Sequence, residues 1–117
     1  MNWYIAKVIF RITSGKDTNK SQFDEHLKLV QANSFEEALL KARIIGLKEE
    51  CSFLNDHRQP VKWEFVNVAE LIPLKELRDG QEVYSRIHET ETDEASTYIH
   101  NVHQRAASLQ LTHRPLF

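Results

Sequence analysis

Cysteine and glycine are scarce in this 117-residue sequence, and their scarcity excludes several kinds of chemistry. Cys51 is the single cysteine, so no disulfide can form within the chain. A chain of this length can bury a core without disulfides or metals, and one lone cysteine favours a reducing compartment. The three glycines, at positions 15, 46 and 80, lie far apart, so the glycine-rich loop that cradles phosphates is absent.

Long hydrophobic runs are missing as well. No stretch approaches the roughly 20 apolar residues of a membrane-spanning helix. The first ten residues lack a basic start and are interrupted by Lys7, unlike a signal peptide. We therefore expect a cytoplasmic protein without membrane contact. The net charge of −2 also argues against general attraction to nucleic acid.

Alternation with a period of two predicts two strands, over residues 3–12 and 23–32, joined by a polar loop as a hairpin. The first strand has one wholly apolar face, formed by Tyr4, Ala6, Val8, Phe10 and Ile12. In the second strand Phe23, Leu27 and Leu29 share a phase, and His26, Lys28 and Val30 are expected on the outward face. Each strand therefore has one core face and one mixed face.

A capping-box pattern, Ser34 with Glu37 three residues later, predicts a helix that continues to about Cys51. Ala38, Ala42 and Gly46 form a row of small residues, which predicts close approach to the sheet. The same helix has a second apolar stripe, which consists of Leu40, Ile44, Leu47 and Cys51. This stripe must pack against another surface than the one that covers the first.

The second half of the chain predicts two more strands and a tail helix. In residues 61–71 the apolar positions of the alternating pattern shift by one after Phe65, which indicates a bulge or burial on both faces of the strand. Residues 81–89 follow the turn signal at Gly80, and an acidic run leads into an amphipathic helix over about 93–109. We expect an α+β fold: a four-stranded antiparallel sheet in β-β-α-β-β order, one helix across one face, and a C-terminal amphipathic helix. Residues 1–89 form a single domain, and residues 90–117 form an acidic linker and a helix that packs on this domain or on a partner chain.

Candidate chemistry is sparse. Cys51 and His57 are close enough in sequence for a thiol dyad, but Cys51 continues an apolar stripe, where a buried thiol is expected. His100 and His103 can approach each other on the tail helix, but zinc needs at least one further ligand. We therefore predict no catalytic, cofactor or metal site, and a protein that is not an enzyme.

Two surfaces are candidates for interaction. The first is the outward face of the sheet, with Trp3, Ile5, Lys7, Ile9, Arg11, Tyr84 and Arg86. The second joins the two helices, through Leu40, Ile44, Leu47, Tyr98, Ile99 and Val102. These apolar stripes exceed what one sheet face can bury, so we expect a non-catalytic interaction module that forms a homodimer. The alternative is a binding protein for an anionic ligand or single-stranded nucleic acid on the basic and aromatic sheet face.

Four stretches of the sequence resemble a known bacterial family. They are Asn2-Trp3-Tyr4-Ile5-Ala6-Lys7, the run over residues 32–38, the segment over residues 61–68, and Asp79-Gly80-Gln81-Glu82-Val83-Tyr84-Ser85-Arg86. In this order they are similar to the domain of unknown function 4288 family. The resemblance implies a small bacterial domain, brings no catalytic residue with it, and does not cover the tail after Glu89.

Overall fold

The structure is a computed structural model that describes residues 1–15 and 21–112, with side chains up to residue 109. Most of the predicted loop between the first two strands, residues 16–20, lies outside the described residues. The elements in chain order are β1 Asn2–Ser14, β2 Gln22–Ala32, α1 Phe35–Lys48, β3 Cys51–Leu54, β4 Pro60–Leu74, the 3-10 turn η1 Thr92–Glu94, and α2 Ala95–Thr112.

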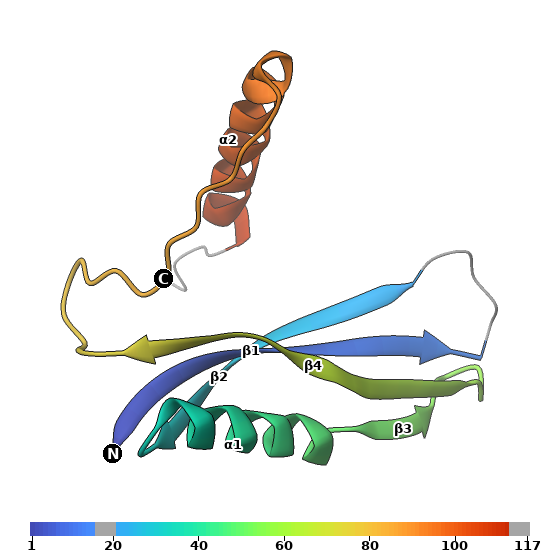
Figure 1. Cartoon of the computed structure of the whole chain (residues 1–117). Helices are drawn as coiled ribbons and strands as arrows, with labels where there is room; N and C mark the ends of the chain where they lie inside the picture. The colour runs from blue at the N-terminus through green and yellow to red at the C-terminus, as the bar shows by residue number, and fades with distance from the viewer. Residues whose placement is uncertain (16–20, 113–117) are drawn as a thin grey trace, which may run out of the picture. The chain divides into compact units, whose positions relative to one another are not determined.

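The four strands form one antiparallel sheet in the order β2-β1-β4-β3, and α1 lies across one of its faces (Figure 1). The predicted α+β class and the β-β-α-β-β order are confirmed. One strand is not the expected one, however. Residues 81–89 do not form a strand, and the short β3 takes the place of the fourth strand beside β4.

The β3–β4 hairpin closes through hydrogen bonds from the backbone to the side chain of Asn55. Asn55 Oδ1 accepts from the backbone N–H groups of His57, at 2.8 Å, and Gln59, at 3.0 Å. Arg58, within this turn, has a positive φ of 59°, which is the left-handed backbone conformation typical of tight turns. Residues 55–60 thus form a turn that brings residues 51–54 back onto β4.

Two irregularities in the pairing of β4 with β1 explain the change of phase in the β4 sequence. Register shifts occur between Lys7 and Val8 and between Ile9 and Phe10. At each shift one residue of β4 has no partner in β1. The side chains of β4 that follow the shift therefore lie on the opposite face of the sheet from the one that strict alternation predicts. As a result Trp63, Phe65, Val68 and Leu71 all pack against the core cluster. The predicted bulge is confirmed.

The core lies between α1 and one face of the sheet. Its buried residues are Tyr4, Ala6, Val8, Phe10, Val30, Ala32, Ala38 and Ala42. The predicted apolar face of the first strand therefore supplies half of the core. Ser34 caps α1, because its Oγ accepts from the Glu37 N–H at 3.1 Å, while Glu37 Oε2 accepts from the Asn33 N–H at 3.3 Å.

The chain divides into two compact units, Met1–Tyr84 and Ser85–Phe117. The second unit contains η1 and α2, and within it the rings of His88 and Tyr98 stack with centroids 5.2 Å apart. Along α2 the apolar side chains of Tyr98, Ile99 and Val102 are exposed. Among the described residues, no helix is both long enough and apolar enough to cross a membrane.

Candidate functional site

The face of the sheet that points away from α1, here called the outer face, brings five of the predicted interaction residues together. Because Tyr4, Ala6, Val8 and Phe10 point to α1, the alternating residues of β1 point the other way. These are Trp3, Ile5, Lys7, Ile9 and Arg11. Their partners in β2 are Gln31, Leu29, Leu27, Glu25 and Phe23.

The expected orientation of β2 is therefore wrong. The register pairs Val8 with His26 and Ala6 with Lys28, so these polar side chains lie on the α1 side of the sheet. Val30 is buried there as well. The apolar phase of the strand, with Phe23, Leu27 and Leu29, belongs to the outer face. The hairpin register decides this, because directly opposed residues of paired strands share a face.

Apolar side chains dominate the outer face and are strongly exposed. Trp3, Phe23, Leu27 and Leu29 have exposed fractions between 45% and 68%. Half-buried aliphatic residues extend this surface across β1 and β4, namely Ile5, Ile9, Ile72 and Leu74. A contiguous apolar surface of this kind typically marks an interaction site.

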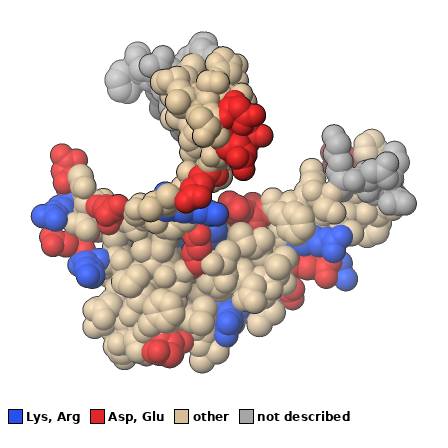
Figure 2. All heavy atoms as spheres, turned by 45° about the horizontal axis from the view of Figure 1, so that its top comes forward, with Lys and Arg blue, Asp and Glu red and all other residues tan. Residues whose placement is uncertain are grey.

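Charges on the outer face compensate one another. Lys7 Nζ lies 3.8 Å from Glu25 Oε2 and 3.9 Å from Glu70 Oε2. Arg11 stands opposite Glu64 in the register, and Lys62 shares this face. The charges of these three basic and three acidic residues thus cancel. In Figure 2, too, basic and acidic side chains lie next to one another on the first unit, without a continuous basic area on the side presented.

The remaining predicted interaction residues are divided between the two units. Tyr84 reaches the outer face, where its hydroxyl donates to Glu70 Oε1 at 2.9 Å. Arg86 lies in the second unit. On α1, the side chains of Leu40, Ile44 and Leu47 are exposed.

Cys51 is exposed, so the expectation of a buried thiol is wrong. The helix ends at Lys48, and Cys51 begins β3 instead of continuing the stripe. His57 follows the other end of β3, roughly 10 Å of strand away, so the two do not form a dyad. Among the described residues, no group of three or more His, Cys, Asp or Glu side chains can hold a metal ion.

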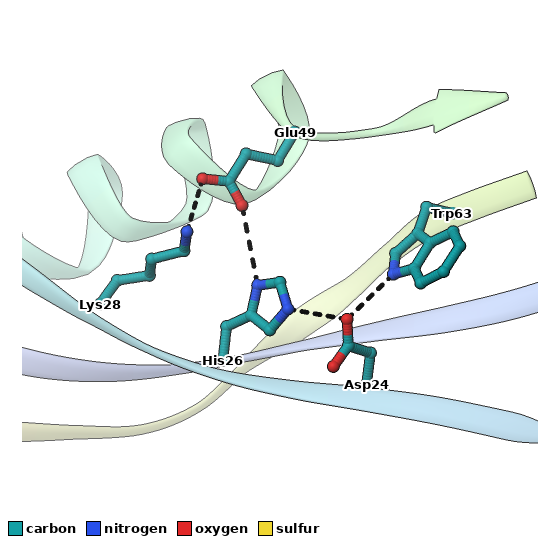
Figure 3. Close-up of polar contacts among 5 residues, drawn as sticks. All are labelled: Asp24, His26, Lys28, Glu49 and Trp63. Carbon is teal, nitrogen blue, oxygen red and sulfur yellow. Dashed lines mark hydrogen bonds and ion pairs between the residues drawn. The ribbon is translucent and has the colours of Figure 1, made fainter. Parts of the chain in front are cut away.

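A cluster of polar side chains occupies the α1 side of the sheet near the end of the helix (Figure 3). Asp24 and His26 come from β2, and Glu49 is the C-cap of α1. His26 Nε2 lies 2.7 Å from Asp24 Oδ2, which also accepts from Trp63 Nε1 at 3.1 Å. On the other side, Glu49 Oε1 lies 2.8 Å from Lys28 Nζ. The cluster therefore joins the edge strand to the end of the helix.

An open groove of about 390 Å³ lies over this cluster, here called the helix-end groove. Its walls are Phe10, Asp24, His26, Glu49, Cys51, Phe53 and Trp63. The rings of Phe53 and Trp63 stack with centroids 6.1 Å apart, and those of Phe10 and His26 lie 5.2 Å apart. Among the described residues, the buried Nδ1 of His26 has no hydrogen-bond partner, and it lies 3.9 Å from Glu49 Oε2.

The sequence reasoning missed this groove. One signal was available: Asp24, His26 and Lys28 alternate with apolar residues, so the strand carries one polar face. The assignment of His26 and Lys28 to the outward face hid the relation between this polar face and Trp63. The contact between Asp24 and Trp63 joins positions 39 apart in the chain, and no local pattern predicts such a pair.

The fold and these two surfaces define a two-layer α+β domain with an open outer face. The chain belongs to the family Domain of unknown function (DUF4288), whose model matches residues 3–85. The match ends almost where the first compact unit ends, at Tyr84, so the family domain is this unit. No curated protein and no solved structure is significantly similar to the chain.

Proposed function

We propose that this protein is a non-catalytic interaction module that forms a homodimer by packing the outer faces of two sheets. The observation that carries the proposal is the exposure of Trp3, Phe23, Leu27 and Leu29 on one side of a sheet that is buried on the other side. Burying a side chain of this size stabilises by roughly 1.5–3 kcal/mol, so this face provides a strong drive for association.

The balance of charge supports a second copy as the partner. Lys7, Arg11 and Lys62 are matched by Glu25, Glu64 and Glu70, so two identical faces meet without net repulsion. A twofold axis is the commonest way to pair identical surfaces, and stacked sheets bury their apolar faces in this manner. The alternative, an anionic ligand or single-stranded nucleic acid, needs an excess of positive charge. The neutral outer face favours the dimer.

The setting we propose is the bacterial cytoplasm. The bacterial origin rests on the family resemblance, and an exposed Cys51 as the single cysteine is suited to a compartment that keeps thiols reduced.

Light scattering on the full-length chain tests the dimer at on the order of tens of micromolar, where specific interfaces are commonly populated. We expect a dimer for the unmodified protein and a monomer for Leu27→Asp, because the new carboxylate would be buried in the interface. Leu40→Asp is the matched control. Leu40 on α1 is exposed to 59% and Leu27 to 68%, so both changes place a charge on a comparable surface leucine.

The outcomes separate the two candidate interfaces. If Leu40→Asp abolishes the dimer while Leu27→Asp leaves it intact, the interface is the exposed stripe of α1. A monomeric unmodified protein at this concentration overturns the proposal. Circular dichroism of each variant shows that the fold is retained.

A further inference from the structure

We infer that the helix-end groove binds a small organic cation, an ammonium or guanidinium group attached to an apolar body. This site lies on the α1 side of the sheet and is independent of the proposed dimer face. Three properties of the groove carry the inference: its charge, its unpaired acceptor and its aromatic walls.

The charged side chains that line the groove are carboxylates. Asp24 and Glu49 lie in its wall, and Lys28 is held by Glu49 Oε1 at 2.8 Å. Asp24, Glu49 and Lys28 together carry an excess of one negative charge. Since carboxylates form their strongest hydrogen bonds with charged N–H donors, the site selects a cation over an anion.

His26 adds an acceptor that has no donor. Its Nε2 donates to Asp24 Oδ2 at 2.7 Å, so in the neutral ring Nδ1 carries a lone pair. This buried Nδ1 has no hydrogen-bond partner in the part of the chain that the structure describes, although buried polar groups in folded proteins nearly always have one. Glu49 Oε2 is a second acceptor 3.9 Å from it. One ammonium or guanidinium group placed between these two acceptors can donate to both.

Aromatic rings form the remaining wall. Trp63, Phe53 and Phe10 all line the groove. Among the aromatic residues, tryptophan attracts a cation over the face of its ring most strongly. The hydrogen bond from Trp63 Nε1 holds Asp24 beside the ring, at 3.1 Å (Figure 3). The ligand's charge can therefore meet His26 Nδ1 and Glu49 Oε2 while its apolar body contacts the rings.

The size of the groove restricts the ligand to a small molecule. A volume of about 390 Å³ lies near the lower end of the usual range for ligand pockets, roughly 300–1,000 Å³. A phenylalkylammonium ion is a suitable probe, because it combines one ammonium group with one ring.

The test is an NMR titration of the full-length, ¹⁵N-labelled protein that follows the Trp63 side-chain Nε1–H signal. The probe is 2-phenylethylammonium. Its matched controls are 3-phenylpropionate, an anion of similar shape, and 2-phenylethanol, which is neutral. We expect a saturable shift of the Trp63 signal with the cation, and affinities at least roughly tenfold weaker for the anion and the alcohol. The Trp3 signal, which comes from the outer face, should not follow the same saturation curve.

Two single substitutions locate the site. Asp24→Asn should weaken binding of the cation by roughly tenfold, because it removes one negative charge from the groove wall and the carboxylate that accepts from His26 Nε2. Glu25→Gln is the matched control, because it removes the neighbouring carboxylate in sequence from the opposite face of the sheet. Glu49→Gln gives a second reading that does not depend on how Asp24 supports His26.

Several results would overturn the inference. These are equal affinity for the cation and the anion, unchanged binding in both Asp24→Asn and Glu49→Gln, or absence of a Trp63 shift at millimolar probe. If Glu25→Gln weakens binding as much as Asp24→Asn does, the attraction is unspecific and the groove is not the site.

Discussion

Gly46 of α1 packs directly against the ring of Phe65 of β4. A Cβ atom at Gly46 would lie 3.1 Å from Val8 Cγ1 and closer still to two ring carbons of Phe65. The absence of a side chain at this position therefore permits the helix to approach the sheet. Ala38 and Ala42 continue the same row and are fully buried.

We predict that Gly46→Ala destabilises the protein. Alanine improves helix propensity by roughly 1 kcal/mol over glycine, but overpacking a core contact commonly costs roughly 1–3 kcal/mol. The added methyl group meets the ring of Phe65 and a methyl group of Val8, so we expect the cost to exceed the gain.

Urea denaturation measures the change in unfolding free energy for Gly46→Ala. The control is Arg43→Ala, an exposed position of the same helix, which should change stability by less than about 0.5 kcal/mol. A stabilised Gly46→Ala variant would show that the helix can move away from β4 at no cost.

The N-cap of α1 gives a second prediction. Ser34→Ala removes the acceptor for the Glu37 N–H, which lies 3.1 Å from Ser34 Oγ, and should destabilise by about 1 kcal/mol. Ser34→Asp provides another acceptor at the same place and should retain most of the stability. Thermal unfolding of both variants checks this, and equal losses for alanine and aspartate would contradict the capping role.

The thiol of Cys51 should react readily in the folded protein. Cys51 is exposed at the start of β3, so a thiol-specific reagent can reach it without unfolding. We expect labelling rates in native buffer and in denaturant to agree within about tenfold. Protection far greater than this would indicate that a partner or a second copy covers the groove at Cys51.

The packing partner of α2 is the subject of the last prediction. An isolated helix of this length is marginal in water, so its stripe of Tyr98, Ile99 and Val102 needs a cover. Two surfaces compete: the stripe of α1 around Ile44, and the outer face around Ile5. The α1 stripe is purely apolar, whereas the outer face carries Lys7 and Arg11 and is the proposed dimer interface, so we expect α2 to pack on α1.

Hydrogen exchange across α2 distinguishes these surfaces through two matched substitutions, Ile44→Asp and Ile5→Asp. We expect faster exchange in α2 only for Ile44→Asp, since burying Ile99 and Val102 contributes roughly 1.5–3 kcal/mol each. If only Ile5→Asp accelerates exchange, α2 covers the outer face instead.

Features that depend on neighbours in sequence were determined by the sequence alone. Alternation in residues 3–12 identified the core face of β1, and Ser34 with Glu37 identified the start of α1. The row of Ala38, Ala42 and Gly46 indicated the side of α1 that meets the sheet. These patterns succeed because side-chain direction within one helix or strand follows from its backbone geometry.

Tertiary structure decided how the elements combine. The alternation of β2 separates a polar face from an apolar one, but pairing with β1 determined that Asp24 and His26 face the helix. The turn at Asn55 lets residues 51–54 pair with β4, so β3 is the fourth strand of the sheet instead of residues 81–89. The contact between Asp24 and Trp63 arises because two strands distant in sequence flank β1. A period of two in a sequence defines two faces of a strand, and only the strands paired with it determine which face is buried.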